Sequence, residues 1–531
     1  MTVTRRRACL LGLGALAAGR VRAMQNLDAA PESGALHVLN RLAYGPAPGD
    51  LARVMLIGPQ RYIAEQLQPE RLPLPAALQR QLDGLESTHW SQHELITRFR
   101  DAQKAVRTDS EQGKAERRAL YQGIALQAGE ARLLRAMHSP AQLQEVMVEF
   151  WFNHFNVYVG KGLDRVLVEN YEREAIRPHA FGRFRDLLGA TAKHPAMLFY
   201  LDNWLSAAPG YRAPGGKAGP GRASGLNENY ARELMELHTL GVDGGYSQTD
   251  VSELARMLTG WTFEGGNRRR SEGDSTFRFD AARHDGGDKL WLGRRVVARG
   301  QAEGEEALDV LAAHPATAHH LAFQLSQYFV QDDPSTALVQ RVAQRFRASG
   351  GDIRAVLQSL FDSPEFQAPQ ALGVKFKTPY RYLVSTLRAC DLPVSNVRPL
   401  LATAYQLGMP LYGCQTPDGY KNTEQAWLNP DAITRRVAFA TAFASGRLPL
   451  ARPVEDEDYG GMGKAAMQRA IDPRPNANRY NPAWSTPPVD AQALLAVLGS
   501  SISGRTRATV AQSDTGLRAA LVLGSPDFMR Y

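Results

Sequence analysis

The sequence predicts a mainly α-helical fold, formed by one large multi-helical domain over residues 24–531. Apolar residues recur three or four positions apart along most of the chain, which is the spacing of a helix face. Short strand patterns occur only in a minor excursion near 277–293. The hydrophobic content of 44% is ordinary for a soluble globular protein, and 531 residues are enough to bury a large core.

The spacing of apolar residues predicts the elements one after another along the chain. The first helices are expected at 36–42, 48–55, 59–67, 91–105, 113–138, 139–155, 164–175, 183–193 and 196–204. Helices at 227–241 and 247–259 come next, followed by strands at 277–279 and 289–292. Helices resume at 304–313, 317–329, 337–348, 353–360, 379–388, 397–407, 431–444, 490–498 and 506–523. Stretches rich in Gly, Pro or Asn predict loops at 207–225, 264–276 and 452–486.

The first 23 residues have the pattern of a secretory signal peptide. Three arginines at 5–7 form a basic start, an apolar run follows at 8–18, and cleavage is expected near Ala23. The apolar run is too short for a membrane span, and the paired arginines suggest the twin-arginine route. We therefore expect a periplasmic or secreted protein with no transmembrane span in the mature chain. An uncleaved anchor is the alternative.

The charge and the cysteines limit the function classes further. The formal charge of +8 includes five arginines of the signal segment, which holds no acid, so the mature chain carries +3. No basic stripe with interleaved aromatic residues occurs, and nucleic-acid binding is not expected. Two cysteines remain after cleavage, Cys390 and Cys414. They could form one disulfide in an oxidising compartment or be two buried thiols.

The segment from Asn227 to Gly241 carries more ionisable groups than a packing helix needs. These groups are Glu228, Arg232, Glu233, Glu236 and His238. His238 falls on the apolar stripe of the predicted helix, where a polar ring must find a partner. That partner could be a metal ion, a substrate or a buried carboxylate. Because no His or Glu lies one turn earlier on the same face, the helix cannot hold a metal alone.

A second candidate is His154, within the run Trp-Phe-Asn-His-Phe at 151–155. Glu149 and Asn153 lie one turn apart on another face of the same predicted helix, whereas His154 lies near the aromatic residues. A histidine among aromatic rings often has a lowered pKa and makes one firm hydrogen bond. It is either a ligand or catalytic group, or a core histidine with a satisfied ring. A site shared with His238 requires the two rings to lie together.

A third candidate is the pair His284-Asp285 in a Gly-rich turn. Loops carry many functional residues, and glycines let the backbone approach a ligand closely. A polar turn between two strands is an equally good interpretation. The sequence contains no Gly-x-Ser-x-Gly elbow, no phosphate-binding loop and no dinucleotide-binding glycine motif. Nucleophilic catalysis and nucleotide binding are therefore not indicated.

Six segments of the chain carry a resemblance to a known family. They are WFNHF at 151–155, NENYARELMELHTLGVDGGY at 227–246, DVSELARMLTGWTF at 250–263, RHDGGDKLWLG at 283–293, HPATAHHLAFQLSQYFVQDDP at 314–334 and PDGYKNTEQAWLNPDAITRR at 417–436. They resemble the bacterial family called domain of unknown function 1800. The resemblance implies an exported bacterial protein with a co-encoded, exported, sulfatase-like protein as partner. It implies no established reaction.

The chain departs from the family pattern at two places. The pattern Trp-His-Asn-His-Phe has a histidine where this chain has Phe152, so a metal held by both histidines would lose one ligand. A Lys and an Arg of the pattern are replaced by Gln324 and Gln327, and a site that needs those cations for an anionic group would be lost with them. The resemblance thus also fits a diverged or inactive member.

Two functional hypotheses follow. The first is a metal-dependent envelope or extracellular enzyme, a hydrolase or an oxidoreductase, with a divalent or transition metal. Its candidate catalytic residues are His154, Glu228, Glu233, His238, His284 and Asp285, of which His154 and His238 are the candidate metal ligands. The second is a non-catalytic binding or assembly protein that works with a co-exported partner. Phe152 and the absence of a complete catalytic motif motivate it.

Overall fold

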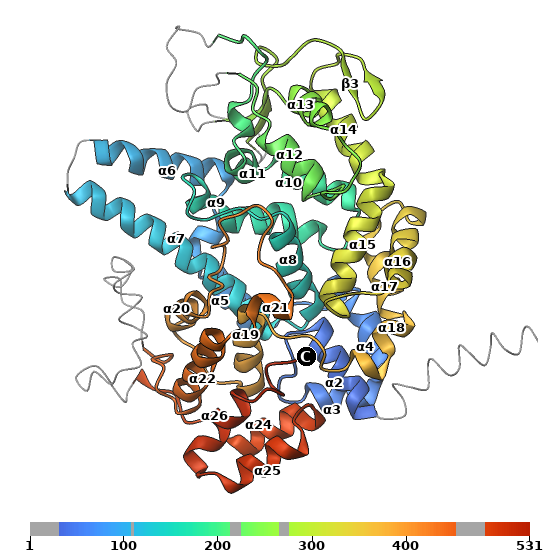
Figure 1. The fold of residues 1–531 in the computed structure, drawn as a ribbon. Coiled ribbons are helices and arrows are strands. Elements are labelled where there is room, and N and C mark those ends of the chain that lie inside the picture. Colours follow the sequence, from blue (N-terminus) through green and yellow to red (C-terminus); the bar gives the residue numbers. More distant parts are fainter. Residues whose placement is uncertain (1–30, 108–110, 213–224, 265–275, 453–483) are drawn as a thin grey trace, which may run out of the picture.

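The computed structural model describes residues 31–107, 111–212, 225–264, 276–452 and 484–531. In these ranges the chain is mainly α-helical with two small antiparallel sheets, which confirms the predicted fold class (Figure 1). The expected signal segment 1–23 lies outside the described residues. So do most of the expected loops at 207–225, 264–276 and 452–486.

The first half of the fold is a succession of helices. They are α2 (Pro31–Leu42), α3 (Asp50–Ile57), α4 (Pro59–Gln66), α5 (Ala76–Asp83), α6 (Gln92–Arg107), α7 (Glu111–His138), α8 (Gln142–His154), α9 (Asp164–Tyr171), α10 (Phe184–Lys193), α11 (Pro195–Tyr200), α12 (Asn229–Glu236) and α13 (Gln248–Met257). The helices α6 and α7 lie side by side and extend from the remaining helices at the left of Figure 1. The apolar spacing does not predict α5, because only Leu78 and Leu82 mark its buried face.

Two short hairpins follow α13. Strand β1 (Trp261–Phe263) pairs with β2 (Phe277–Phe279), and β3 (Lys289–Trp291) pairs with β4 (Arg294–Val296), both antiparallel. The sequence predicts β2 and β3 and misses their partners, since three residues are too few for a clear alternation. Leu292 and Gly293 form the turn between β3 and β4 with φ of 48° and 71°. Two successive positive φ values are typical of the tight turns that join antiparallel strands.

The second half of the fold returns to helices. They are α14 (Gln301–Ala313), α15 (Pro315–Phe329), α16 (Thr336–Ala348), α17 (Ile353–Phe361), α18 (Pro364–Gln367), α19 (Pro379–Cys390), α20 (Arg398–Gln406), α21 (Glu424–Trp427), α22 (Pro430–Ala444), α24 (Ala491–Leu498), α25 (Gly504–Gln512) and α26 (Arg518–Leu523). The longer helices of this group agree with the predicted ranges to within a few residues. Within the described ranges, no helix has both the length and the apolar character that a membrane span requires.

Three predicted helices differ from the structure. The helix expected at 506–523 is interrupted between α25 and α26, because Ser513 and Asp514 adopt extended backbone and compete for local hydrogen bonds. The helix expected at 164–175 ends at Tyr171 and continues as a π-helical turn. The helix expected at 227–241 ends at Glu236, as described below.

Helix α8 lies in the middle of the molecule, surrounded by other helices (Figure 1). Nearly all its side chains are buried, including Glu145, Glu149 and His154. The Trp151 indole N–H donates to the carbonyl oxygen of Ala180 at 3.1 Å. Because buried polar groups need partners inside the protein, the contacts of the polar residues of α8 identify the candidate sites.

Cys390 and Cys414 are both free thiols.

Candidate functional site

His238 lies just beyond the end of α12 and not within it. The backbone N–H groups of Leu237 and His238 both donate to the carbonyl oxygen of Glu233, at 2.9 and 3.0 Å. The hydroxyl of Thr239 donates to the carbonyl oxygen of Leu234 at 2.6 Å. A side-chain hydroxyl that donates to a carbonyl oxygen of the last helical turn competes with the backbone N–H groups and favours the end of the helix. His238 is 1% exposed, so the sequence correctly places it on the buried side.

The structure brings His154, His238 and His320 together, and we refer to these three as the histidine cluster. The ring centroid of His154 lies 6.1 Å from that of His238 and 6.3 Å from that of His320. His154 donates from Nε2 to the carbonyl oxygen of His238 at 3.1 Å, and its Nδ1 lies 2.8 Å from the amide of Gln324. The cluster therefore joins α8, the end of α12 and α15.

Burial keeps the histidine cluster neutral. It lowers the pKa of His154 to about 3, helped by the nearby His320, and it lowers the pKa of His238 and His320 as well. Nε2 of His238 is buried without a hydrogen-bond partner among the described residues. Across those same residues, no three His, Cys, Asp or Glu side chains lie so that they could hold one metal ion.

The other sequence candidates lie in separate contacts. Glu228 accepts hydrogen bonds from Gln248 at 2.8 Å and from Ser252 at 2.5 Å, which ties the start of α12 to α13. Glu233 is partly buried, and burial together with Glu236 raises its pKa. Neither carboxylate hydrogen-bonds to a residue of the histidine cluster.

His284 and Asp285 hold the Gly-rich turn in place. The carboxylate of Asp285 accepts from Arg256 Nε at 2.9 Å and Nη2 at 3.0 Å. His284 donates from Nδ1 to the carbonyl oxygen of Thr259 at 3.0 Å, and its Nε2 lies 3.2 Å from Glu303 Oε1. Glu303 in turn accepts from the buried Lys289. The geometry fits the alternative that the sequence left open, a polar turn between strands.

Phe152 points away from the histidine cluster. Residues two apart on a helix differ by about 200°, so positions 152 and 154 face opposite sides of α8. The ring of Phe152 packs on Tyr412 at 4.9 Å and lies 5.4 Å from the guanidinium of Arg132. A histidine at position 152 would therefore face Arg132 and Tyr412. The expectation that two histidines of this motif share one metal does not fit this geometry.

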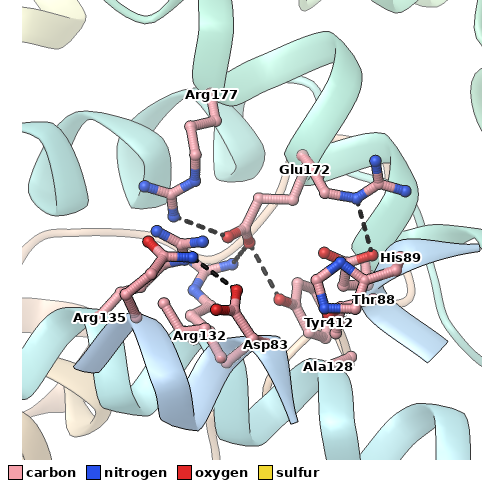
Figure 2. Close-up of a pocket in the computed structure, with 14 residues that line it drawn as sticks. Asp83, Thr88, His89, Ala128, Arg132, Arg135, Glu172, Arg177 and Tyr412 are labelled. Carbon is pink, nitrogen blue, oxygen red and sulfur yellow. Dashed lines mark hydrogen bonds and ion pairs between the residues drawn. The ribbon is translucent and has the colours of Figure 1, made fainter. Parts of the chain in front are cut away.

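A cavity of about 80 Å³ is lined by Arg132, whose guanidinium also lies over the ring of Phe152, and we call it the arginine cavity (Figure 2). Its acidic and basic lining residues are Asp83, His89, Arg132, Arg135, Glu169, Glu172, Arg173 and Arg177. They come from α5, α7, α9 and the turns that follow α5 and α9. The sequence interpretation did not single out any of them.

Glu172 organises one wall of the arginine cavity. Its carboxylate accepts from Arg132 at 2.8 Å, from Arg177 at 3.3 Å and from the hydroxyl of Tyr412 at 3.0 Å (Figure 2). Burial alone would raise the pKa of Glu172, but Arg132 and Arg177 outweigh it and hold the pKa below its usual value. Arg177 also makes a bidentate ion pair with Glu145, at 2.8 and 2.9 Å. The network is buried and charged.

Two unusual backbone conformations meet at Glu172. The π-helical turn spans Glu172–Ile176, and such turns occur frequently at functional sites. Tyr412 has a φ of 56°, a left-handed conformation that costs a residue other than glycine about 1–2 kcal/mol. The hydrogen bond from Tyr412 to Glu172 connects the two. The meeting of a π-helical turn and a left-handed residue at one buried carboxylate marks this cavity as the candidate functional site.

Arg135 differs from the other arginines of the cavity because it has no ion pair with a carboxylate among the described residues. Arg132 and Arg177 pair with Glu172, and Arg173 lies 3.4 Å from Glu169. Arg135 forms no ion pair and donates no hydrogen bond within the described residues, and it is only partly buried. Burial and the neighbouring Arg177 lower the pKa of Arg135, and the nearby carboxylates Glu145, Glu172 and Glu169 offset this only in part.

Fold and site together define a mainly α-helical protein with an arginine-lined cavity. The family model described as "Protein of unknown function (DUF1800)" matches residues 37–530, so the chain belongs to this family. This confirms the resemblance found in the sequence. Comparison with curated proteins and with solved structures gives no match.

Proposed function

We propose that the chain is a non-catalytic binding protein that holds the anionic group of a small molecule in the arginine cavity. The observation that carries the proposal is the guanidinium of Arg135, which lines the cavity without an ion pair among the described residues. A guanidinium offers five N–H donors in a planar fork that matches carboxylate and phosphate oxygens. Binding an anion would satisfy this group.

The volume of the cavity limits the ligand. About 80 Å³ corresponds to roughly five to eight waters at about 10–15 Å³ each. A ligand of that many non-hydrogen atoms fits, which includes acetate, phosphate and sulfate. A larger molecule could place only its charged end group inside. Asp83 and His89 are exposed side chains of the lining, so this part of the cavity is accessible from solvent.

The enzyme hypothesis rests on a different observation, the histidine cluster with its free Nε2 on His238. A general base needs a pKa near the working pH, whereas burial lowers the pKa of His154 to about 3. A neutral His238 could still bind a metal through Nε2, with the protein rearranged around it. Metal analysis of protein purified from its native compartment tests this second candidate, and one tightly bound transition metal for each chain would favour it.

The proposal includes export, supported by the basic start, the apolar run and the small-residue cleavage pattern of the first 23 residues. A binding protein in that compartment could deliver its ligand to a co-exported partner, and the sulfatase-like protein implied by the family resemblance is the first to test. Co-purification of the two proteins would support this part of the proposal. Recovery of the chain from the cytoplasm with an intact amino terminus would contradict it.

Titration calorimetry tests the central proposal. Acetate, sulfate and inorganic phosphate are titrated into the wild-type chain, into Arg135→Gln and into Arg118→Gln. Arg118 is an exposed arginine of the same helix α7 and provides the matched control. We expect at least one anion to bind to the wild type and to Arg118→Gln with similar affinity. The affinity of Arg135→Gln for the same anion should be lower by a factor of about ten or more. Absence of binding by all three anions, or equal binding by Arg135→Gln, would contradict the proposal.

A further inference from the structure

Two ionised side chains of the arginine cavity remain unpaired when its ion pairs are assigned. Arg132, Arg173 and Arg177 each have a carboxylate within 3.4 Å. Arg135 has none, and Asp83 has no cationic partner among the described residues. The cavity therefore presents one cation and one carboxylate that form no ion pair among the described residues.

Asp83 is the last residue of α5 and is exposed. Its Oδ1 accepts a hydrogen bond from the amide of Gln79 at 2.7 Å, which fixes the carboxylate and leaves Oδ2 without a hydrogen-bond donor. An ionised carboxylate accepts hydrogen bonds only, so the group needs a donor from solvent or from a ligand.

Arg135 lies on α7, which packs against α5. In Figure 2, Arg135 and Asp83 both lie on the side of the cavity opposite Arg177. They line the same cavity, but no ion pair joins them among the described residues. Two opposite charges held apart in one small cavity are complementary to a ligand that carries both charges.

We infer that the ligand of the arginine cavity is a small zwitterion, an α-amino acid with a short side chain, bound with its carboxylate on Arg135 and its ammonium group on Asp83. The inference rests on the proposed function. The planar guanidinium binds a carboxylate through two parallel hydrogen bonds, and the ammonium group supplies donors to Oδ2 of Asp83. Glycine has five non-hydrogen atoms and alanine six, so both fit the volume of about 80 Å³.

The exposure of Asp83 and of Arg135 agrees with this orientation of the amino acid. The ammonium group is strongly hydrated and would lie at the exposed side chain of Asp83. The carboxylate would lie deeper, beside the partly buried Arg135. A simple anion such as acetate could use Arg135 but would leave Asp83 unpaired and would be repelled by its charge. The site should therefore distinguish a zwitterion from a simple anion of similar size.

The test compares glycine, alanine, acetate and N,N,N-trimethylglycine by calorimetric titration of the full chain. Trimethylglycine keeps both charges but has no N–H donor. We expect glycine or alanine to bind about tenfold or more tightly than acetate, and trimethylglycine to bind more weakly than glycine. In Asp83→Asn the preference for glycine over acetate should disappear, while acetate binding is retained or becomes tighter.

Glu86→Gln is the matched control, because Glu86 is an exposed acid shortly after Asp83. It should keep the preference for glycine. A second variant, Arg135→Lys, keeps the positive charge and should bind glycine more weakly than the wild type, because an ammonium group cannot form the bidentate contact. Thermal unfolding of each variant shows whether it is folded; Asp83 is exposed, so its replacement should leave the unfolding temperature within a few degrees.

The outcomes separate this inference from the proposed function. If acetate binds as tightly as glycine, or if Asp83→Asn keeps the preference, the zwitterion inference is overturned and anion binding stands. If acetate, sulfate and phosphate all fail to bind to the wild type, the proposed function is overturned, and the inference that rests on it is overturned with it.

Discussion

The hydroxyl of Tyr412 donates a hydrogen bond to the carboxylate of Glu172 at 3.0 Å, and this bond joins a residue of left-handed backbone conformation to a π-helical turn. Tyr412 comes from the connection between α20 and α21 and has a positive φ. Glu172 begins the π-helical turn after α9. The two residues are 240 positions apart, so this bond is a tertiary contact. The arginine cavity lies where they meet.

Replacement of Glu172 by Gln should destabilise the fold strongly. It leaves the buried cations Arg132 and Arg177 without one of their carboxylates, and the loss of one partner of a buried ion pair costs about 3–5 kcal/mol. The measurement is the midpoint of thermal or denaturant unfolding. Glu111→Gln removes the partner of a surface pair with Lys114 and should leave the midpoint unchanged. Equal midpoints for the two variants would show that the Glu172 network contributes nothing to stability.

Replacement of Tyr412 by Phe should cost less. The ring keeps its contacts with Phe152 and Arg132, and only the hydrogen bond to Glu172 is lost. A hydrogen bond to a charged group contributes about 1.5–3 kcal/mol. Tyr405→Phe, at an exposed tyrosine, should change the free energy of unfolding by less than about 0.5 kcal/mol. A Tyr412→Phe variant as stable as the Tyr405→Phe control would contradict the role assigned to this bond.

Glu169 should make the protein less stable as the pH rises towards neutrality. Burial is the main reason that its pKa is raised from 4.5 to about 7, and Arg173 and Glu172 act in opposite directions. Between these two values the folded state binds more protons than the unfolded state, so stability from this group falls with increasing pH. The full effect amounts to about 3 kcal/mol at most. In unfolding curves recorded from pH 4.5 to pH 7.5, Glu169→Gln should lose this decline, and an unchanged pH dependence would disprove the assignment.

His194 should have the opposite effect. Burial is the main reason that its pKa is lowered from 6.5 to about 3, with a further contribution from Arg173. Between pH 3 and 6.5 the unfolded state takes up a proton that the folded state does not, so stability falls as the pH decreases below 6.5. The slope for one proton is about 1.4 kcal/mol for each pH unit.

A His194→Asn variant isolates this proton. Nδ1 of His194 accepts from the backbone N–H of Ala196 at 3.1 Å at the start of α11, and Asn can provide the same cap. As the pH decreases below 6.5, the unfolding midpoint should therefore fall less steeply in the variant than in the wild type. Parallel curves for the two proteins would show that His194 is not the source of the slope.

Most of the helices could be predicted because their buried faces repeat every three or four residues. The interruption at Ser513 and the early end of α12 could not, since both depend on which hydrogen bonds polar side chains form in the folded state. The π-helical turn at Glu172 has no pattern of its own in the sequence. It is visible only once α9 is placed against its neighbours.

The candidate site was harder to predict than the fold. His154 and His238 were singled out because a histidine on an apolar face needs a partner, and the structure does bring their rings together. The arginine cavity was missed because its residues come from separate segments and look like ordinary surface charges. One signal was present: Arg132 and Arg135 lie three apart within an otherwise largely buried stretch of α7.

Anomalous diffraction from crystals soaked in selenate tests the central claim most directly. Selenate is a five-atom anion that fits the arginine cavity, and selenium identifies its position. The account predicts an anomalous peak inside the cavity within hydrogen-bond distance of the Arg135 guanidinium, and no such peak in Arg135→Gln crystals. A cavity without a peak in the wild type, or the same peak in both crystals, would contradict the claim that Arg135 binds the anionic group of the ligand.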